Sequence, residues 1–189
     1  MSFPRKCIPL LAVLIWAGAP LVAEVIDINV SDEAVRLAYI FQFESSGLEV
    51  DTSWLHHDDE DADVGAVGLQ IVEIGGEASG PWSVGLGGRL FYVKTDAEDG
   101  SGLGLGGHVG YRPRRLQRFE VALHTFYSPG AISFGDTEKF LDAGLTVGFW
   151  VLPRGKIYLG AREVRADFEQ RSSVTIDDGV HFGLRIGFK

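Results

Sequence analysis

Apolar residues alternate with glycine and charged residues along much of this chain. Over 179–188 every even-numbered residue is apolar, and every odd-numbered residue is glycine, histidine or arginine. A similar alternation recurs over 102–112. A period of two residues predicts β-strands, because successive side chains of a strand point to opposite faces. Strands that are apolar on one face and polar on the other are typical of a membrane barrel with lipid outside and polar side chains inside.

Alternation and turn residues together predict ten strands. They cover 25–30, 34–43, 47–57, 63–74, 82–94, 101–112, 118–128, 139–151, 156–168 and 178–188. Most are long enough to cross a bilayer, which takes roughly nine to eleven residues in a tilted strand. The predicted fold is therefore all-β, a closed antiparallel transmembrane barrel of about ten strands. The first segment is short, so eight strands remain an alternative.

Loop lengths suggest how this barrel is oriented. Outer-membrane barrels have short periplasmic turns and longer external loops. We expect 44–46, 113–117, 152–155 and the slightly longer 75–81 on the periplasmic side, and 57–62, 95–100, 129–138 and 169–177 on the external side. This assignment returns both chain ends to the periplasm only when 25–30 forms a real strand.

The first 23 residues have the features of a cleavable secretory signal peptide. Arg5 and Lys6 precede an apolar centre, and 21–23 (Leu-Val-Ala) is a suitable cleavage site. The apolar run is too short and interrupted for a good membrane-spanning helix. We therefore expect 1–23 to be removed and 24–189 to form one barrel domain in the outer membrane. Cleavage also removes Cys7, the single cysteine, which excludes disulfides and thiolate chemistry.

The polar face of the predicted strands carries charged residues and histidines. The expected lumen-lining residues are Arg36, Glu49, Asp51, Arg89, His108, Arg112, Glu120, His124, Asp142, Arg162, His181 and Arg185. A small barrel is nearly filled by its interior side chains, and buried charges need partners. We expect arginine–carboxylate pairs to plug the lumen. Carboxylate partners for Arg89, Arg162 and Arg185 would argue against an open channel. A soluble lipocalin-like barrel would have the opposite polarity.

Aromatic residues near the predicted strand ends are candidates for the two headgroup levels of the membrane. They are Trp54, Trp82, Tyr127, Tyr158 and Phe188. Aromatic residues also favour strands in general.

One predicted external loop is strongly acidic. Its candidate cation ligands are His56, His57, Asp58, Asp59, Glu60, Asp61 and Asp63. Carboxylate oxygens suit hard divalent cations, although no EF-hand spacing is present and a solvated loop is the simpler interpretation. Shared divalent ions would let such a loop meet lipopolysaccharide.

Other functions receive little support from composition and motifs. The net charge is −9, and −11 without the leader, which argues against nucleic-acid binding. Only His57 with Asp59, and His124 with Ser128, suggest catalytic pairs. Neither pair has a recognised spacing, so we predict no enzyme activity and no cofactor.

Several segments of the chain resemble the YfaZ family of Gram-negative outer-membrane proteins. The resemblance rests on Gly47-Leu48 leading into 54–61 (Trp-Leu-His-His-Asp-Asp-Glu-Asp), on the glycine-rich 65–68, on 126–129 (Phe-Tyr-Ser-Pro) and on the closing strand 183–188. It extends from about Ala34 to the end of the chain and implies a small outer-membrane barrel. It implies no catalytic or binding residues. The chain ends on Lys189 instead of the aromatic residue usual at the end of such barrels.

These features predict a structural or surface-interaction protein of the outer membrane. A narrow diffusion channel for small solutes or ions is the first alternative, and an enzyme at the external rim is the second. The expected partners are outer-membrane lipid, lipopolysaccharide and the barrel-assembly machinery.

Overall fold

Antiparallel strands make up most of the part of the chain that the structure describes. A computed structural model describes residues 23–43, 46–76, 81–95, 98–169 and 173–188. The long strands are β1 (Ala23–Val30), β2 (Ala34–Phe43), β3 (Leu48–His57), β4 (Ala62–Gly75), β5 (Trp82–Lys94), β6 (Asp99–Tyr111), β7 (Phe119–Ser128), β9 (Thr137–Leu152), β10 (Gly155–Phe168) and β11 (Val174–Phe188). The shorter elements are β8 (Ser133–Gly135) and the 3₁₀ turns η1 (Arg114–Leu116) and η2 (Gly130–Ile132).

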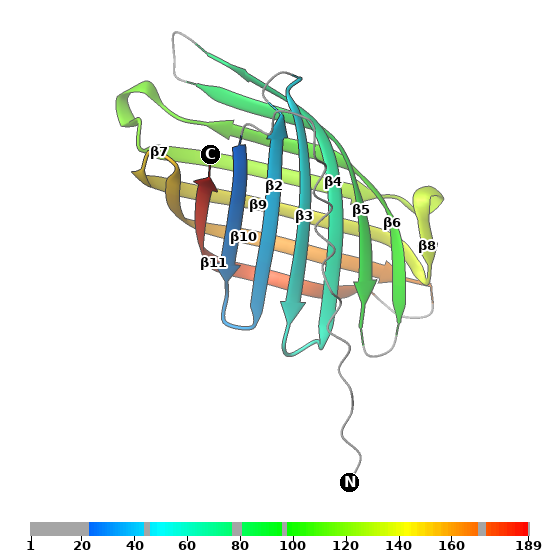
Figure 1. The fold of residues 1–189 in the computed structure, drawn as a ribbon. Coiled ribbons are helices and arrows are strands. Elements are labelled where there is room, and N and C mark those ends of the chain that lie inside the picture. Colours follow the sequence, from blue (N-terminus) through cyan, green and yellow to red (C-terminus); the bar gives the residue numbers. More distant parts are fainter. Residues whose placement is uncertain (1–22, 44–45, 77–80, 96–97, 170–172, 189) are drawn as a thin grey trace.

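The ten long strands close into a barrel. Each pairs antiparallel with its neighbours along the chain, with β7 pairing to β9 because β8 stands outside this order. β1 pairs with β11, and Ile28 lies opposite Leu184 in that pair. In Figure 1, β2 to β6 cross the front of the barrel, and β7, β9 and β10 cross behind them at a steep angle. Pairing between β5 and β6 leaves no open edge in the ring.

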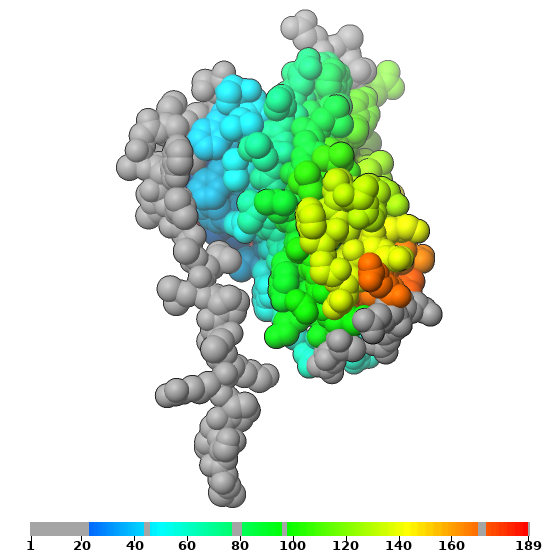
Figure 2. Space-filling model, turned by 90° about the vertical axis from the view of Figure 1, so that its right-hand side faces the viewer, coloured from blue at the N-terminus to red at the C-terminus, as the bar shows by residue number. Residues whose placement is uncertain are grey.

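The ten predicted strands are confirmed, including the short first one. β2 and β5 have the predicted bounds, and the ends of the other strands shift by up to four residues. The three-residue β8 was not predicted. It follows η2 and pairs with Gly100–Gly102 of β6, so this segment extends the wall beyond the end of β7. In Figure 2 the yellow segment that contains it lies against the green strands of the wall.

The barrel has two ends, which differ in the segments that they carry. The terminus end holds the start of β1, the ends of β2, β4, β6, β9 and β11, and the starts of β3, β5, β7 and β10. The opposite ends of these strands form the far end, which also holds the described connections 31–33, 58–61 and 129–136. The chain enters β1 and leaves β11 at the same end of the barrel, as the even count of ten long strands predicts.

The predicted difference in loop length is wrong. Connections have two to seven residues at the terminus end and three to eight at the far end. The predicted loops 57–62 and 169–177 are shorter than expected because β3, β4 and β11 extend into them. Polar residues near a strand end were interpreted as loop, although a strand that projects beyond an apolar band is polar on both faces. Loop length therefore gives no orientation for this barrel.

Two tight turns have a local cause in the sequence. Gly47 adopts a φ of 63°, which favours glycine, and its carbonyl accepts a hydrogen bond from the Val72 amide at 2.7 Å. Asp61 has a φ of 40° and ends the turn that joins β3 to β4. Aspartate tolerates this conformation better than most residues, so the acidic segment forms a four-residue turn.

The outer wall is apolar and the interior is charged. On β5, Leu86 is 69% exposed on the outer face while Arg89 is 8% exposed on the inner face. The same alternation leaves large apolar side chains exposed on all ten long strands, among them Ile71, Leu145 and Val180. Within the residues that the structure describes, no helix is long and apolar enough to cross a membrane.

Candidate functional site in the barrel lumen

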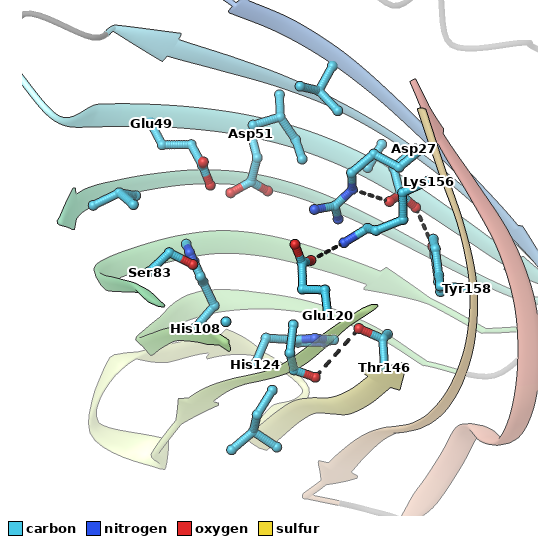
Figure 3. Close-up of a pocket in the computed structure, with 18 of the residues that line it drawn as sticks. Asp27, Glu49, Asp51, Ser83, His108, Glu120, His124, Thr146, Lys156 and Tyr158 are labelled. Carbon is cyan, nitrogen blue, oxygen red and sulfur yellow. Dashed lines mark hydrogen bonds and ion pairs between the residues drawn. The ribbon is translucent and has the colours of Figure 1, made fainter. Parts of the chain in front are cut away.

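The interior of the barrel contains a cavity of about 530 Å³ that reaches the terminus end. Eleven of the twelve predicted lumen residues line it, and Asp142 lies just beyond its inner limit. The cavity begins near Pro81 and Trp82 and ends at a layer that includes Arg36, Arg89 and Arg162. Figure 3 looks into this space and shows charged side chains that converge from β1, β3, β7 and β10.

Glu120 organises the mouth of the cavity. Its carboxylate pairs with Lys156, accepts a hydrogen bond from Arg112 at 3.1 Å and accepts another from the Trp150 indole at 3.1 Å. The Arg112 guanidinium also lies over the Trp150 ring, 4.4 Å from its centroid. Cation–π and charge-assisted contacts therefore hold these side chains against the wall.

Asp27 organises a second cluster, on the wall formed by β1, β10 and β11. It accepts hydrogen bonds from Arg185 at 2.6 Å and from the Tyr158 hydroxyl at 2.5 Å. Asn29 donates to Tyr158 at 3.0 Å. Figure 3 shows Tyr158 and Asp27 meeting beside Lys156. Tyr158 was expected at the outer headgroup level, but it is buried in the lumen because it shares the inward face of β10 with Arg162.

A third group of charges crosses the lumen at the inner limit of the cavity. Asp142 on β9 accepts hydrogen bonds from Arg89 at 2.9 Å, Arg36 at 3.4 Å and His124 at 3.2 Å. Arg89 also pairs with Asp51 on β3 at 3.1 Å. This group therefore joins strands from opposite sides of the barrel.

Arg162 forms a separate and deeply buried ion pair. It donates to Asp177 from Nε at 2.6 Å and to Asn29 at 2.8 Å. Arg89, Arg162 and Arg185 thus each have a carboxylate partner, which argues against an open channel.

The remaining predicted residues have other contacts. His108 shares a hydrogen bond with Gln70 at 3.1 Å, and Gln42 donates to Glu49 at 2.8 Å. His181 packs edge-on against the Tyr158 ring.

Interior glycines lie directly across from large side chains on the neighbouring strand. The pairs are Gly68 with Asp51, Gly85 with His108, Gly102 with Phe91, Gly144 with His124, Gly160 with His181 and Gly183 with Tyr158. A Cβ at any of these glycines would collide with the side chain opposite. The glycines therefore let long side chains lie across the wall, which explains why glycine and polar residues share one face of the pattern.

Beyond the charged groups, the interior becomes apolar toward the far end. The inward faces of seven strands contribute a buried cluster of Ala34, Leu55, Ala62, Val64, Phe91, Val93, Phe140, Val164, Ala166, Phe168 and Ile176. At its centre the rings of Phe91 and Phe140 are stacked with centroids 4.0 Å apart. Every member is at most 6% exposed. We call this group the apolar cluster.

Almost no space separates the apolar cluster from the charged groups. A void of about 10 Å³ lies between them, lined on one side by Arg36, Arg89 and Asp142 and on the other by Leu55 and Phe140. That is about the space of one water molecule. The 530 Å³ cavity is therefore continuous only with the terminus end among the described residues.

The acidic turn does not bring its predicted cation ligands together. His56 lies on the outer face, where it contacts Asp63 at 3.1 Å and Asp58 at 3.2 Å. His57 lies on the inner face, 3.6 Å from Glu33. The two histidines alternate across β3, so they point to opposite sides of the wall. Within the described ranges, no group of three or more His, Cys, Asp or Glu side chains is placed to hold a metal ion.

The two candidate catalytic pairs also separate. His124 contacts Asp142, whereas the Ser128 hydroxyl bonds to that of Ser133 at 2.9 Å. His57 accepts the backbone amide of Glu60 instead of contacting the Asp59 side chain.

Sequence reasoning missed several interior residues. Asp27, Lys156 and Tyr158 follow the inward period of their strands, so periodicity would have found them. Asp177 pairs with Val164 beside an irregularity in the β10–β11 register, where Ile176 is left between the partners of Val164 and Arg165. Here Ile176 and Asp177 are both buried, so a strict period of two fails.

Comparisons with known proteins identify a matching family and some similar solved structures. The chain matches the family described as "YfaZ precursor" over residues 6–188. No curated protein matches it. A solved KdgM porin is similar with a TM-score of 0.48 and 12% identity, covering 89% of this chain and all of that one. A KdgM porin in complex with disordered oligogalacturonate is similar with a TM-score of 0.47 and 14% identity, at the same coverage.

Proposed function

Because the chain belongs to the YfaZ family and folds into a closed barrel, we propose that it is an integral outer-membrane protein of structural or surface-interaction type. Residues 1–22 lie outside the described residues, and in this proposal the leader 1–23 is cleaved on export. The apolar outer wall supports membrane insertion, since side chains such as Leu86 and Val180 lie exposed on it. Soluble proteins rarely expose so continuous an apolar surface.

The proposal that the lumen is closed rests on the apolar cluster. Ions and polar solutes entering from the terminus end would meet paired charges and then a layer of phenylalanine, valine and leucine side chains. Passage would require hydrating that layer and separating ion pairs such as Arg89–Asp142. Separating buried charge pairs is strongly unfavourable. The closed lumen favours a structural or surface role over the diffusion channel.

We assign the surface role to the far end of the barrel. Its connections carry many carboxylates, including the turn Asp58–Asp61. In the outer leaflet these groups would contact lipopolysaccharide through divalent ions shared with its phosphates. The separated pairs His57/Asp59 and His124/Ser128 give no support to a rim-located enzyme.

Planar-bilayer conductance tests the closed lumen. We expect the purified barrel to insert without steady conductance steps. The double variant Phe91→Ala and Phe140→Ala removes the two stacked rings at the centre of the apolar cluster, and should conduct. The control Leu90→Ala and Leu145→Ala trims outward side chains of the same two strands and should stay closed.

Heat-dependent gel mobility verifies that each variant forms a folded barrel before its conductance is compared. Regular conductance steps from the unmodified protein would contradict the proposal and favour the channel.

A further inference from the structure

The cavity at the terminus end has the size of a ligand site. Its volume of about 530 Å³ lies within the usual 300–1,000 Å³ of small-molecule pockets. Its walls combine polar groups with apolar side chains, among them Ile40, Val72 and Trp82. The cavity is thus both large enough and mixed enough in character to hold a small organic molecule.

The cations of the lumen are already engaged. Each Arg or Lys that lines the cavity has a carboxylate within ion-pair distance among the described residues. The pairs are Arg36–Asp142, Arg89–Asp51, Arg112–Glu120, Lys156–Glu120, Arg162–Asp177 and Arg185–Asp27. These cations therefore offer little to an anionic ligand.

Among the described residues, Glu49 is the carboxylate lining the cavity that forms no ion pair with an arginine or lysine. It is 7% exposed and lines the cavity from β3. Its Oε2 accepts a hydrogen bond from the Gln42 amide at 2.8 Å, and no cationic side chain in the described part of the chain forms an ion pair with it. A buried carboxylate normally has a charged partner, so Glu49 is the lumen carboxylate best placed to accept a cationic group of a ligand that enters the cavity.

Asp51 adds a second free acceptor on the same wall. It lies two residues further along β3, on the same face, and is 4% exposed. Its Oδ2 pairs with Arg89, but its buried Oδ1 has no hydrogen-bond partner. Figure 3 shows Glu49 and Asp51 side by side, pointing into the cavity. An unsatisfied buried acceptor is unfavourable, and a bound donor would satisfy it.

We propose that this cavity binds an organic amine, with its ammonium group held by Glu49 and Asp51. An ammonium carries three donors and one positive charge, which matches two neighbouring acceptors and one unpaired carboxylate. The body of the ligand lies against Ile40 and Val72, which line the same cavity. A bare metal ion fits less well, since the described residues contain no metal-holding cluster.

Titration calorimetry of the detergent-solubilised barrel with n-butylammonium tests this site. We expect saturable binding by the unmodified protein and at least tenfold weaker binding by Glu49→Gln, which keeps the shape of the side chain and removes its charge. Butanoate, of similar size and opposite charge, should not bind.

The matched control is Glu73→Gln on β4. Glu73 is exposed on the outer wall, so the same substitution there should leave amine binding unchanged. Equal binding by Glu49→Gln, equal binding of butanoate, or no saturable binding by the unmodified protein would each overturn the proposal. Because the test measures binding in detergent, its outcome is independent of the conductance result.

Discussion

Arg162 is among the most enclosed charges in the barrel. It is 5% exposed and lies with Asp177 and Asn29 between β1, β10 and β11. Because its side chain is almost fully buried, the guanidinium depends on these partners for its stability. Three residues along the same strand, Arg165 makes a comparable contact with Asp167 at 3.2 Å, but on the exposed outer face.

Arg162→Ala should therefore destabilise the barrel much more than Arg165→Ala. Removing one member of a buried ion pair leaves the other charge uncompensated and costs about 3–5 kcal/mol. An exposed pair is worth about 0–1 kcal/mol. Urea unfolding in lipid vesicles, followed by tryptophan fluorescence, measures both changes. Similar losses for the two variants would mean that Arg162 is solvated in the folded barrel.

At this scale the sequence predicted the inward face better than its contacts. Residues such as Arg89 and His124 follow a strict alternation, so their side of the wall is set by strand geometry alone. Their partners depend on which strands meet across the lumen, and Asp142 comes from β9 to meet Arg89 of β5. Pairing across the lumen is a property of the closed ring and leaves no trace in the local sequence.

The strands themselves could be predicted because their period is local. The apolar cluster was not predicted, although Phe91 and Val93 share the inward period of Arg89. A membrane barrel is expected to be polar inside along its whole length, and that expectation concealed a change of character along single strands. On β3 the inward face runs from Glu49 and Asp51 to Leu55.

The outward face of β11 gives a test of membrane insertion. Its exposed apolar side chains run from Val180 to Phe188, with Leu184 at the centre of the run. Leu184→Arg places a charge on the lipid face at the level expected for the bilayer midplane, and should cost about 2–4 kcal/mol. Thr175→Arg, on the exposed face near the far end of the same strand, should cost about 0–1 kcal/mol.

Folded yield in the outer membrane, read from heat-dependent gel mobility, compares the two variants. Depth is then the main difference between two arginines on one strand. Normal yield of Leu184→Arg would count against a lipid-facing wall.

The whole molecule is charged unequally along its axis. Carboxylates gather at and near the far end, at Asp32, Glu33, Asp58, Asp59, Glu60, Asp61, Asp63, Glu98, Asp99, Asp136, Glu138, Asp167 and Glu169. Arginines gather in the connections of the terminus end, at Arg114, Arg115, Arg118 and Arg154. This crowding acts on the carboxylates themselves, since the nearby Asp59 carboxylate raises the pKa of Glu33. This asymmetry replaces loop length as the basis for an orientation.

We propose that the terminus end lies in the periplasm, an orientation that the strand count and the charge asymmetry both favour. An even number of strands returns both chain ends to one side, and export brings the chain to the membrane from the periplasm. The arginines of that end would then face the phospholipid phosphates of the inner leaflet, and the carboxylates of the far end would face the divalent ions of the outer leaflet. In this orientation the cavity opens only to the periplasm, so the ligand of Glu49 would come from that side.

Cysteine labelling of intact cells tests this orientation. The single cysteine of the chain, Cys7, lies in the predicted leader, so the unmodified mature protein should not react and serves as the control. Glu60→Cys places a thiol in the exposed turn of the far end, and Arg115→Cys places one in the exposed η1 of the terminus end. A maleimide that cannot cross the outer membrane should label Glu60→Cys in intact cells and Arg115→Cys only after the membrane is permeabilised. The reverse labelling pattern would place the far end in the periplasm, so that the cavity opens to the cell exterior. Labelling of the unmodified protein would mean that the leader is retained.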